Sequence, residues 1–180
     1  TIKIIDIERL SAAAKKVGAL VVVDNTFATP INQNPLQLGA DIVLHSASKY
    51  LGGHADALGG VICGSRELVK QVYHYREING ATLSPMDAYS FIRGMKTLKL
   101  RVEAQSLAAL KVADALTGCA GVSRVIYPHL DWHPQAALAR KQMKLGGTMV
   151  TFEVAGGKKK AFDVLRHLGI IDISNNLGDA

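Results

Sequence analysis

The sequence predicts an α/β fold with a mainly parallel sheet, on three observations. Helix and strand patterns alternate along the first half of the chain, which is typical of strand-helix-strand units. The strand runs are apolar throughout, as expected of strands that are covered on both faces. They end abruptly in polar or small residues. With 180 residues, of which 48% are hydrophobic and 20% charged, the chain has an ordinary globular composition and can bury its own core.

The first half of the chain gives one helix and a set of strands. Asp6 is a helix cap, and the apolar residues after it recur at spacings of three and four up to a stop at Gly18. Strands are expected at three apolar runs, residues 20–23, 42–44 and 60–63.

The second half begins with a longer helical pattern. Ser84 and Pro85 start an apolar-periodic stretch that runs toward Leu116, and Gly94 can bend it. The elements expected after it are a strand over 122–127, a helix over 134–144, a strand over 148–154, a helix over 161–168 and a strand over 170–173. A change of domain is expected within the long helix, around Leu110.

Composition and charge exclude several classes of protein. The longest apolar run, residues 19–23, is far shorter than the ~20 residues of a membrane-spanning helix, and no charged-then-apolar leader opens the chain. The two cysteines, Cys63 and Cys119, have apolar or small neighbours, so we expect inert core thiols and a reducing, cytoplasmic location. The net charge of +6 is scattered, and the lysines at 158–160 are interpreted as a solvated helix start. No nucleic-acid or membrane partner is therefore expected.

Histidines and acidic residues do not form a predicted metal site. His129 and His133 are four residues apart, and His45, His54 and Asp56 lie close together in sequence. Both sets lack a further partner at a spacing typical of metal ligands. We therefore expect no metal.

Reactive side chains follow two neighbouring strands of the predicted sheet. Asp24 comes directly after the first strand, and Ser46, Ser48 and Lys49 follow the second. Because ligands of open α/β sheets bind outside the carboxyl ends of the strands, we expect these side chains at one rim. Pyridoxal phosphate needs such a set: a lysine for its aldehyde, short donors for its phosphate and an anion for its pyridinium nitrogen. Thr26 is a candidate for positioning the cofactor ring.

Two segments resemble signatures of one enzyme family. Residues 41–54, DIVLHSASKYLGGH, are similar to the cofactor-lysine signature of the Cys/Met metabolism family of pyridoxal-phosphate enzymes. Residues 23–27, VDNTF, are similar to the stretch that supplies the carboxylate for the pyridine nitrogen. Two positions depart from the family pattern: Ser48 replaces the usual threonine, and Ala55 replaces glycine or serine. The resemblance to the family's middle region continues at residues 80–85, 93–98, 127–128 and 133–135.

The resemblance implies a fold and a role for each site residue. The family has the aspartate-aminotransferase-like fold, also called fold type I. Residues 1–110 would then be the C-terminal part of the cofactor-binding large domain, and residues 111–180 part of a smaller C-terminal α/β domain. Lys49 would hold pyridoxal 5'-phosphate and move protons, and Asp24 would hold the ring nitrogen. The two serines after the second strand would bind the phosphate.

Residues 173–179, ISNNLGD, look more like bacterial O-succinylhomoserine sulfhydrylases than γ-lyases, which tend to have serine at the position of Asn176. The resemblance places the Asn176 side chain near the substrate carboxylate. It implies a transferase of methionine biosynthesis that makes homocysteine from O-succinylhomoserine and sulfide. Cystathionine γ-synthase and methionine or cystathionine γ-lyase stay open as alternatives because they use the same cofactor set.

The resemblance also implies an assembly and a longer protein. Family members form dimers that pair into tetramers, with sites at subunit borders. They run to about twice this length, so we expect the chain to be the middle of one. The N-terminal part normally supplies phosphate-binding groups, and the C-terminal part supplies an arginine for the substrate carboxylate. An inactive truncated chain that acts only as a subunit-interaction module therefore stays open as a different kind of function.

Overall fold

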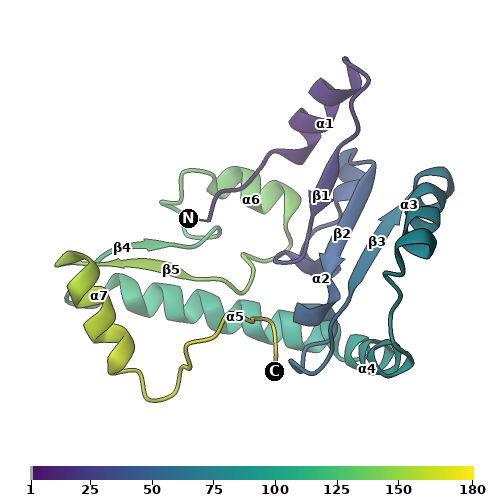
Figure 1. The fold of residues 1–180 in the computed structure, drawn as a ribbon. Coiled ribbons are helices and arrows are strands. Elements are labelled where there is room, and N and C mark those ends of the chain that lie inside the picture. The colour runs from purple at the N-terminus through teal and green to yellow at the C-terminus, as the bar shows by residue number, and fades with distance from the viewer. Residues whose placement is uncertain (1) are drawn as a thin grey trace.

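The computed structural model describes residues 2–180 and shows a mixed α/β chain with two sheets beside one long helix (Figure 1). Turn η1 is a 3-10 helix and turn η2 is a π-type turn. The elements in chain order are α1 (Ile7–Lys15), β1 (Val22–Asp24), α2 (Thr29–Asn32), η1 (Pro35–Leu38), β2 (Ile42–Ser46), η2 (Ala47–Leu51), β3 (Gly60–Gly64), α3 (Arg66–Asn79), α4 (Pro85–Met95), α5 (Leu98–Thr117), β4 (Val122–Ile126), α6 (Ala136–Gln142), β5 (Thr151–Val154) and α7 (Gly157–Arg166).

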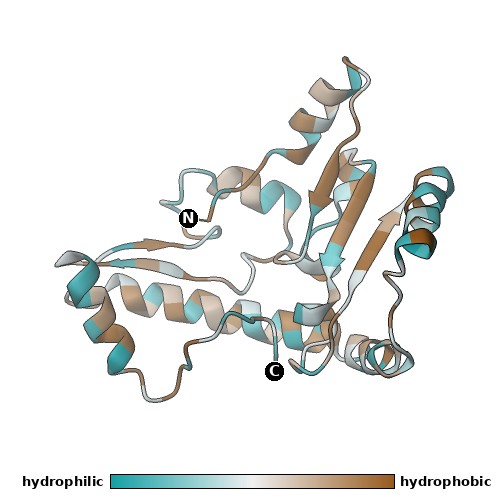
Figure 2. Cartoon of the chain, viewed as in Figure 1, coloured by the Kyte–Doolittle hydropathy of each residue, from teal (hydrophilic) through white to brown (hydrophobic). Residues whose placement is uncertain are grey.

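The first sheet has the strand order β1-β2-β3. Strand β1 is parallel to β2, with Val23 opposite Val43, whereas β3 is antiparallel to β2. The link from β2 to β3 contains only η2 and no crossover helix, which a parallel return would need. The α/β class is thus confirmed, with one antiparallel pairing that the strand patterns did not predict. Figure 2 shows the three strands mainly brown, with β2 turning teal at its arrowhead, where the site residues begin.

Helix α5 connects the two halves of the molecule. Its first half places Leu98 and Val102 in a buried cluster with residues of η2, and its second half places Ala109 and Ala113 in a cluster with β4. The second sheet, β4 with β5, is antiparallel. The domain boundary expected near Leu110 falls inside this continuous helix and stays a prediction.

The long helix predicted from residue 85 is two helices. The chain breaks between α4 and α5 because Thr97 leaves the helical conformation, with φ −106° and ψ 2°. Its hydroxyl donates to the carbonyl of Gly94 at 3.2 Å, which satisfies an acceptor at the end of α4. Gly94 itself permits a close packing contact, since a Cβ there would lie 2.0 Å from the carbonyl oxygen of Gly52.

Two further elements differ from the sequence patterns. Helix α3 was not predicted, although Ser65 caps it by accepting the N–H of Leu68 at 3.3 Å and Gly80 ends it with φ +67°. The strand predicted over 170–173 is wrong, because no strand among residues 2–180 pairs with it and Ile170 is 97% exposed. Apolar β-branched sequence alone therefore did not specify a strand here.

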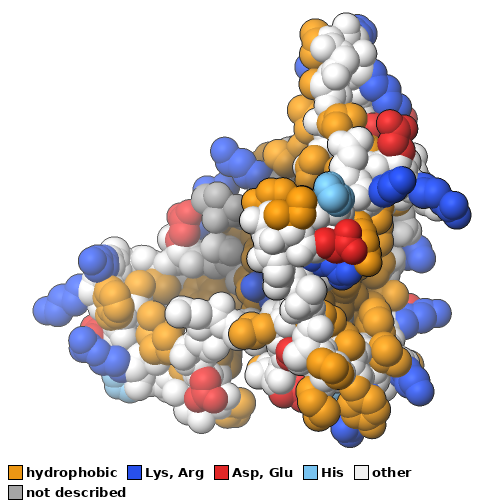
Figure 3. Space-filling model, turned by 45° about the vertical axis from the view of Figure 1, so that its right-hand side comes forward, with side chains coloured by type: hydrophobic (Ala, Val, Ile, Leu, Met, Phe, Trp, Pro, Cys, Tyr) orange, Lys and Arg blue, Asp and Glu red, His pale blue; other side chains and the backbone are white. Residues whose placement is uncertain are grey.

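The exposure of the cysteines differs from the prediction, whereas the position of the lysines at 158–160 agrees with it. Cys63 and Cys119 are both exposed, so the prediction of core thiols is wrong; Cys63 lies on β3, which ends the sheet and is covered little. The lysines at 158–160 lie in α7. Figure 3 shows Lys and Arg side chains scattered over the face of the molecule that it draws. Within residues 2–180, every helix is too short or too polar to cross a membrane.

Replacing Ala55 with glycine is expected to raise the free energy of unfolding by about 0.5 kcal/mol, because glycine adopts the left-handed region without the steric cost that alanine has there. Ala55 has φ +54° in the exposed loop after η2. Denaturant unfolding of the whole protein measures the change. The control is Ala12→Gly in the exposed interior of α1, which is expected to lower stability by about 1 kcal/mol. A loss of stability in both variants would contradict the prediction.

Candidate functional site

Parallel strands β1 and β2 bring the predicted site residues to one edge of the first sheet. Asp24 is the last residue of β1 and lies opposite Leu44, so Ser46, the last residue of β2, follows two positions on. The N–H of Asn25 donates to the carbonyl of Leu44 at 2.9 Å and extends this ladder by one bond. Lys49 follows in η2, where its backbone leaves the helical conformation with φ −96° and ψ −121°.

These residues line one cavity of about 850 Å³. Asp24, Thr26, Ser46 and Lys49 all contribute to its wall. Residues 146–149 also line it, and Ile2, Ile4 and Ile5 add apolar surface. The cavity is therefore a mostly apolar space with a few polar groups, which is the usual character of a small-molecule site.

Thr26 holds the carboxylate of Asp24 in place. Its hydroxyl donates to Oδ1 of Asp24 at 2.5 Å, and its N–H donates to the same oxygen at 2.9 Å. The N–H of Ser46 donates to the Thr26 hydroxyl at 2.8 Å, which ties the ends of β1 and β2 together. The second oxygen, Oδ2 of Asp24, has no hydrogen-bond partner among residues 2–180 and is available to a ligand.

The two serines lie differently. Ser46 lines the cavity, and its hydroxyl has no partner within the described residues. Ser48 is outside the cavity lining, and its Oγ accepts the N–H of Gly59 at 3.0 Å. The structure therefore brings Ser46, but not Ser48, to the cavity with Lys49.

Asn176 is not among the residues that line the cavity. It is exposed in the C-terminal segment, and its N–H donates to the hydroxyl of Ser174 at 3.0 Å. The role that the resemblance implies for Asn176 at the substrate carboxylate stays a prediction.

His45 lies beside the site on the buried face of β2. It is 7% exposed, and burial lowers its pKa, while the negative charge of Asp24 opposes that shift. Neighbouring residues of a strand point to opposite faces, so His45 faces away from the side that Ser46 occupies. The imidazole is accordingly neutral at neutral pH and belongs to the packing behind the site.

Sequence reasoning missed two residues that border the site. Thr148 lines the cavity, and its hydroxyl forms a hydrogen bond with the hydroxyl of Tyr50. Tyr50 follows Lys49 directly and is 3% exposed. Burial raises its pKa, and the hydrogen bond to Thr148 opposes that shift. The available signal for Tyr50 was its place in the lysine motif; nothing in the sequence indicated that Thr148 would lie against it.

The donor set of the cavity fits pyridoxal phosphate. The Lys49 amine forms no hydrogen bond or ion pair within residues 2–180, and the same holds for Oδ2 of Asp24 and the hydroxyl of Ser46. An amine, a carboxylate oxygen and a hydroxyl are thus free in one cavity. They match the aldehyde, the ring nitrogen and the phosphate of the cofactor, in that order.

Comparison with known proteins gives consistent matches. Residues 1–180 match the model of the family described as Cys/Met metabolism PLP-dependent enzyme. The chain is 44% identical over 99% of its length to L-methionine gamma-lyase of Fusobacterium nucleatum subsp. polymorphum, and covers 46% of it. It is 42% identical over 98% of its length to O-succinylhomoserine sulfhydrylase of Pseudomonas aeruginosa, and covers 44% of it.

A solved structure is similarly close. The crystal structure of cystathionine gamma synthase from Xanthomonas oryzae pv. oryzae, in complex with aminoacrylate and cysteine, matches with a TM-score of 0.95 and 41% identity. The match covers 98% of this chain and 46% of that one. The chain spans less than half the length of each of these relatives.

Proposed function

Since the chain belongs to the Cys/Met metabolism family of pyridoxal-phosphate-dependent enzymes, we propose that the whole protein makes homocysteine from O-succinylhomoserine and sulfide. The family, its fold and its cofactor agree with what the sequence predicted. The proposal treats residues 1–110 as part of the cofactor-binding large domain and residues 111–180 as part of the smaller C-terminal domain.

One observation carries the proposed chemistry: the free amine of Lys49 and the free oxygen of Asp24 line the same cavity as the Ser46 hydroxyl. Bound pyridoxal phosphate supplies an electron sink for the charge that forms when a proton leaves the carbon next to the amino group of an amino acid. The three protein groups serve that chemistry by holding the cofactor and by moving protons.

Asp24 is the counter-ion of the ring nitrogen. Its free Oδ2 would accept a hydrogen bond from the protonated ring nitrogen and so keep that nitrogen protonated, while Thr26 occupies Oδ1 and fixes the plane of the carboxylate. Because the Thr26 hydroxyl also accepts a hydrogen bond from the N–H of Ser46, the Asp24 carboxylate and the serine that we assign to the phosphate are held at fixed positions relative to each other. Such preorganisation means that little rearrangement is needed during the reaction.

Lys49 is both the anchor of the cofactor and the base. Its Nζ would take the proton from the Cα of the substrate and then one from Cβ as the γ-ester leaves, and it would return protons to both carbons after sulfide has added at Cγ. The η2 turn sets the direction of this side chain, since the non-helical backbone at Lys49 occurs between helical neighbours.

Replacing Ser46 with alanine is expected to weaken cofactor binding by about tenfold, because a hydroxyl that donates to a phosphate forms a charge-assisted bond. Ser48→Ala is expected to weaken it by only about twofold, because the Ser48 hydroxyl is already bonded to Gly59. Fluorescence titration of the cofactor-free whole protein with pyridoxal 5'-phosphate measures both. A larger effect at Ser48 than at Ser46 would contradict the assignment of Ser46 as the main phosphate ligand.

The choice of reaction rests on the resemblance of residues 173–179 and on the Pseudomonas sulfhydrylase relative. The similar identity to a methionine γ-lyase and to a cystathionine γ-synthase structure favours these two activities as the second candidates. Product analysis separates them. The purified whole protein is supplied with O-succinylhomoserine and sulfide, with O-succinylhomoserine and cysteine, or with methionine alone. Homocysteine in the first mixture supports the proposal; product only in the second or third contradicts it.

We further propose that the whole protein assembles as a homo-oligomer, a dimer of dimers, in the cytoplasm. Support comes from large apolar side chains that α3 and α4 leave exposed, such as Tyr73, Tyr75, Met86, Tyr89 and Ile92. Sedimentation velocity of the purified whole protein tests the assembly, and a monomer at working concentration would contradict it.

A further inference from the structure

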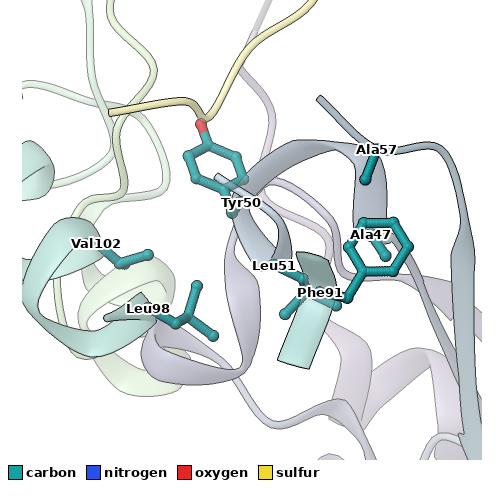
Figure 4. Close-up of a cluster of buried hydrophobic side chains, with 7 residues drawn as sticks. All are labelled: Ala47, Tyr50, Leu51, Ala57, Phe91, Leu98 and Val102. Atoms are coloured by element: carbon teal, nitrogen blue, oxygen red, sulfur yellow. The ribbon is translucent and has the colours of Figure 1, made fainter. Parts of the chain in front are cut away.

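Tyr50, the residue directly after Lys49, joins three segments that are distant in sequence. Its hydroxyl forms a hydrogen bond with the hydroxyl of Thr148, and its carbonyl accepts from Nη1 of Arg101 at 3.0 Å. Gly178 packs against it so closely that a Cβ there would lie 2.8 Å from the Tyr50 nitrogen. Figure 4 shows the Tyr50 ring standing out from the η2 turn, with its hydroxyl at the far end from the backbone.

Thr148 lines the same cavity as Asp24, Ser46 and Lys49. Residues 146–149 all line the cavity, so a shift of Thr148 would change the shape of the cavity that Lys49 also lines. A second tyrosine holds this wall from behind: the hydroxyl of Tyr127 lies 2.9 Å from the carbonyl oxygen of Gly147. Residues 147 and 148 are thus held by two tyrosines, Tyr127 directly after β4 and Tyr50 directly after Lys49.

Arg101 holds the same residue from the side of α5. Its Nη2 donates to the carbonyl of Gly94 at 2.8 Å, and its Nε donates to the hydroxyl of Thr97 at 3.0 Å. With the bond to the Tyr50 carbonyl, the guanidinium connects the end of α4, the start of α5 and the η2 turn. The backbone of Tyr50 is therefore anchored, and its side chain is the part that reaches the cavity wall.

We propose that Tyr50 is a positioning residue that holds the Lys49 turn and the Thr148 wall at a fixed separation through its hydroxyl. The proposal rests on the proposed function, because it assumes that the cavity receives the substrate in front of Lys49. Tyr50 is only 3% exposed, so water does not readily replace the hydrogen bond between the hydroxyls of Tyr50 and Thr148. A buried hydroxyl that loses its partner costs free energy and tends to shift the segment that carries it.

The test is a double-mutant cycle in the cofactor-loaded whole protein with Tyr50→Phe, Thr148→Val and both together. We expect each single variant to lower kcat/KM by about fivefold and the double variant to be no worse than either, because all three lack the same bond. The visible circular dichroism of the bound cofactor is expected to change alike in all three, since it reports the orientation of the cofactor against its lysine. Independent, multiplicative losses in the cycle would overturn the proposal.

Control variants test whether the loss of kcat/KM comes from the missing Tyr50–Thr148 hydrogen bond or from a general loss of structure. Thr117→Val removes the hydroxyl of an exposed threonine at the end of α5 and is expected to keep the parent kcat/KM and spectrum. Thr148→Ser keeps the hydroxyl and is expected to retain most of the activity that Thr148→Val loses. If Tyr50→Phe does not fold, the comparison of Ser and Val at 148 decides, and equal loss in both would overturn the proposal.

Borohydride reduction separates a failure of this inference from a failure of the proposed function. Peptide mapping of the reduced parent protein is expected to find the pyridoxyl adduct on Lys49. An adduct on another lysine would overturn the proposed function and, with it, the basis of the role of Tyr50. An adduct on Lys49, together with multiplicative effects in the cycle, would overturn the role of Tyr50 alone.

Discussion

Replacing Lys49 with alanine in the whole protein is expected to lower kcat by at least about 10³-fold, since it removes both the covalent anchor of the cofactor and the proposed base. The Lys49 amine has no partner within the described residues and lines the cavity, so no structural ion pair or hydrogen bond is lost with it. The fold should therefore survive. Steady-state homocysteine formation measures the loss, and circular dichroism in the far ultraviolet checks the fold.

The matched control is Lys70→Ala, which removes an exposed lysine from α3 and is expected to leave kcat unchanged. Borohydride reduction followed by peptide mapping gives a second, independent reading. It is expected to place the pyridoxyl group on Lys49 in the parent protein and to find none on Lys70 or Lys96. Substantial turnover in Lys49→Ala, or an adduct on either other lysine, would remove Lys49 from its assigned position.

The edge of the sheet that carries Asp24 and Ser46 could be predicted from the sequence for a physical reason. Two uniformly apolar runs that end in polar residues indicate buried strands, and parallel neighbours end at the same edge. The structure pairs Asp24 with Leu44 at that edge. The lysine in the turn after the second strand could be found from the motif because its function requires it to follow that strand directly.

The contacts behind these residues could not be predicted, because they depend on tertiary packing. Ser48 looked equivalent to Ser46, yet the return of the chain at Gly59 captures its hydroxyl. The partners of Tyr50 are 51 and 98 positions away, and no local pattern specifies them. The strand predicted over 170–173 also depended on tertiary packing. A strand needs a neighbouring strand to pair with, and the described chain places none beside these residues.

For β3, the hydropathy pattern predicts that a strand forms but not that it runs antiparallel to β2. Its apolar run has the composition of a covered strand, but the direction of a strand is set by the length and content of the link before it. Here the link carries the π-type turn of Lys49 and no helix. The site and the strand reversal thus have one local cause, the short turn that presents the lysine.

Replacing Asp24 with alanine is expected to lower kcat by about 10²-fold while most of the cofactor stays bound, since the loss of one preorganised electrostatic group costs roughly that much. Lys49 and Ser46 remain to hold the cofactor, and neither forms a hydrogen bond to the Asp24 side chain. Thr26→Val is expected to give a smaller loss, about tenfold, because it leaves the carboxylate in place but removes the bond that orients it. Thr26→Ser is expected to restore most of that loss.

The measurement for Asp24 pairs kcat with bound cofactor per chain, which is determined after release of the cofactor in alkali. Asp172→Ala, at an exposed aspartate of the C-terminal segment, serves as the control and is expected to match the parent protein in both. If Asp24 holds the ring nitrogen, kcat falls far more than occupancy, because a ring without its proton still binds through the phosphate but accepts electrons poorly. Equal losses of kcat and occupancy would make Asp24 a binding residue only, and normal turnover would remove it from the site.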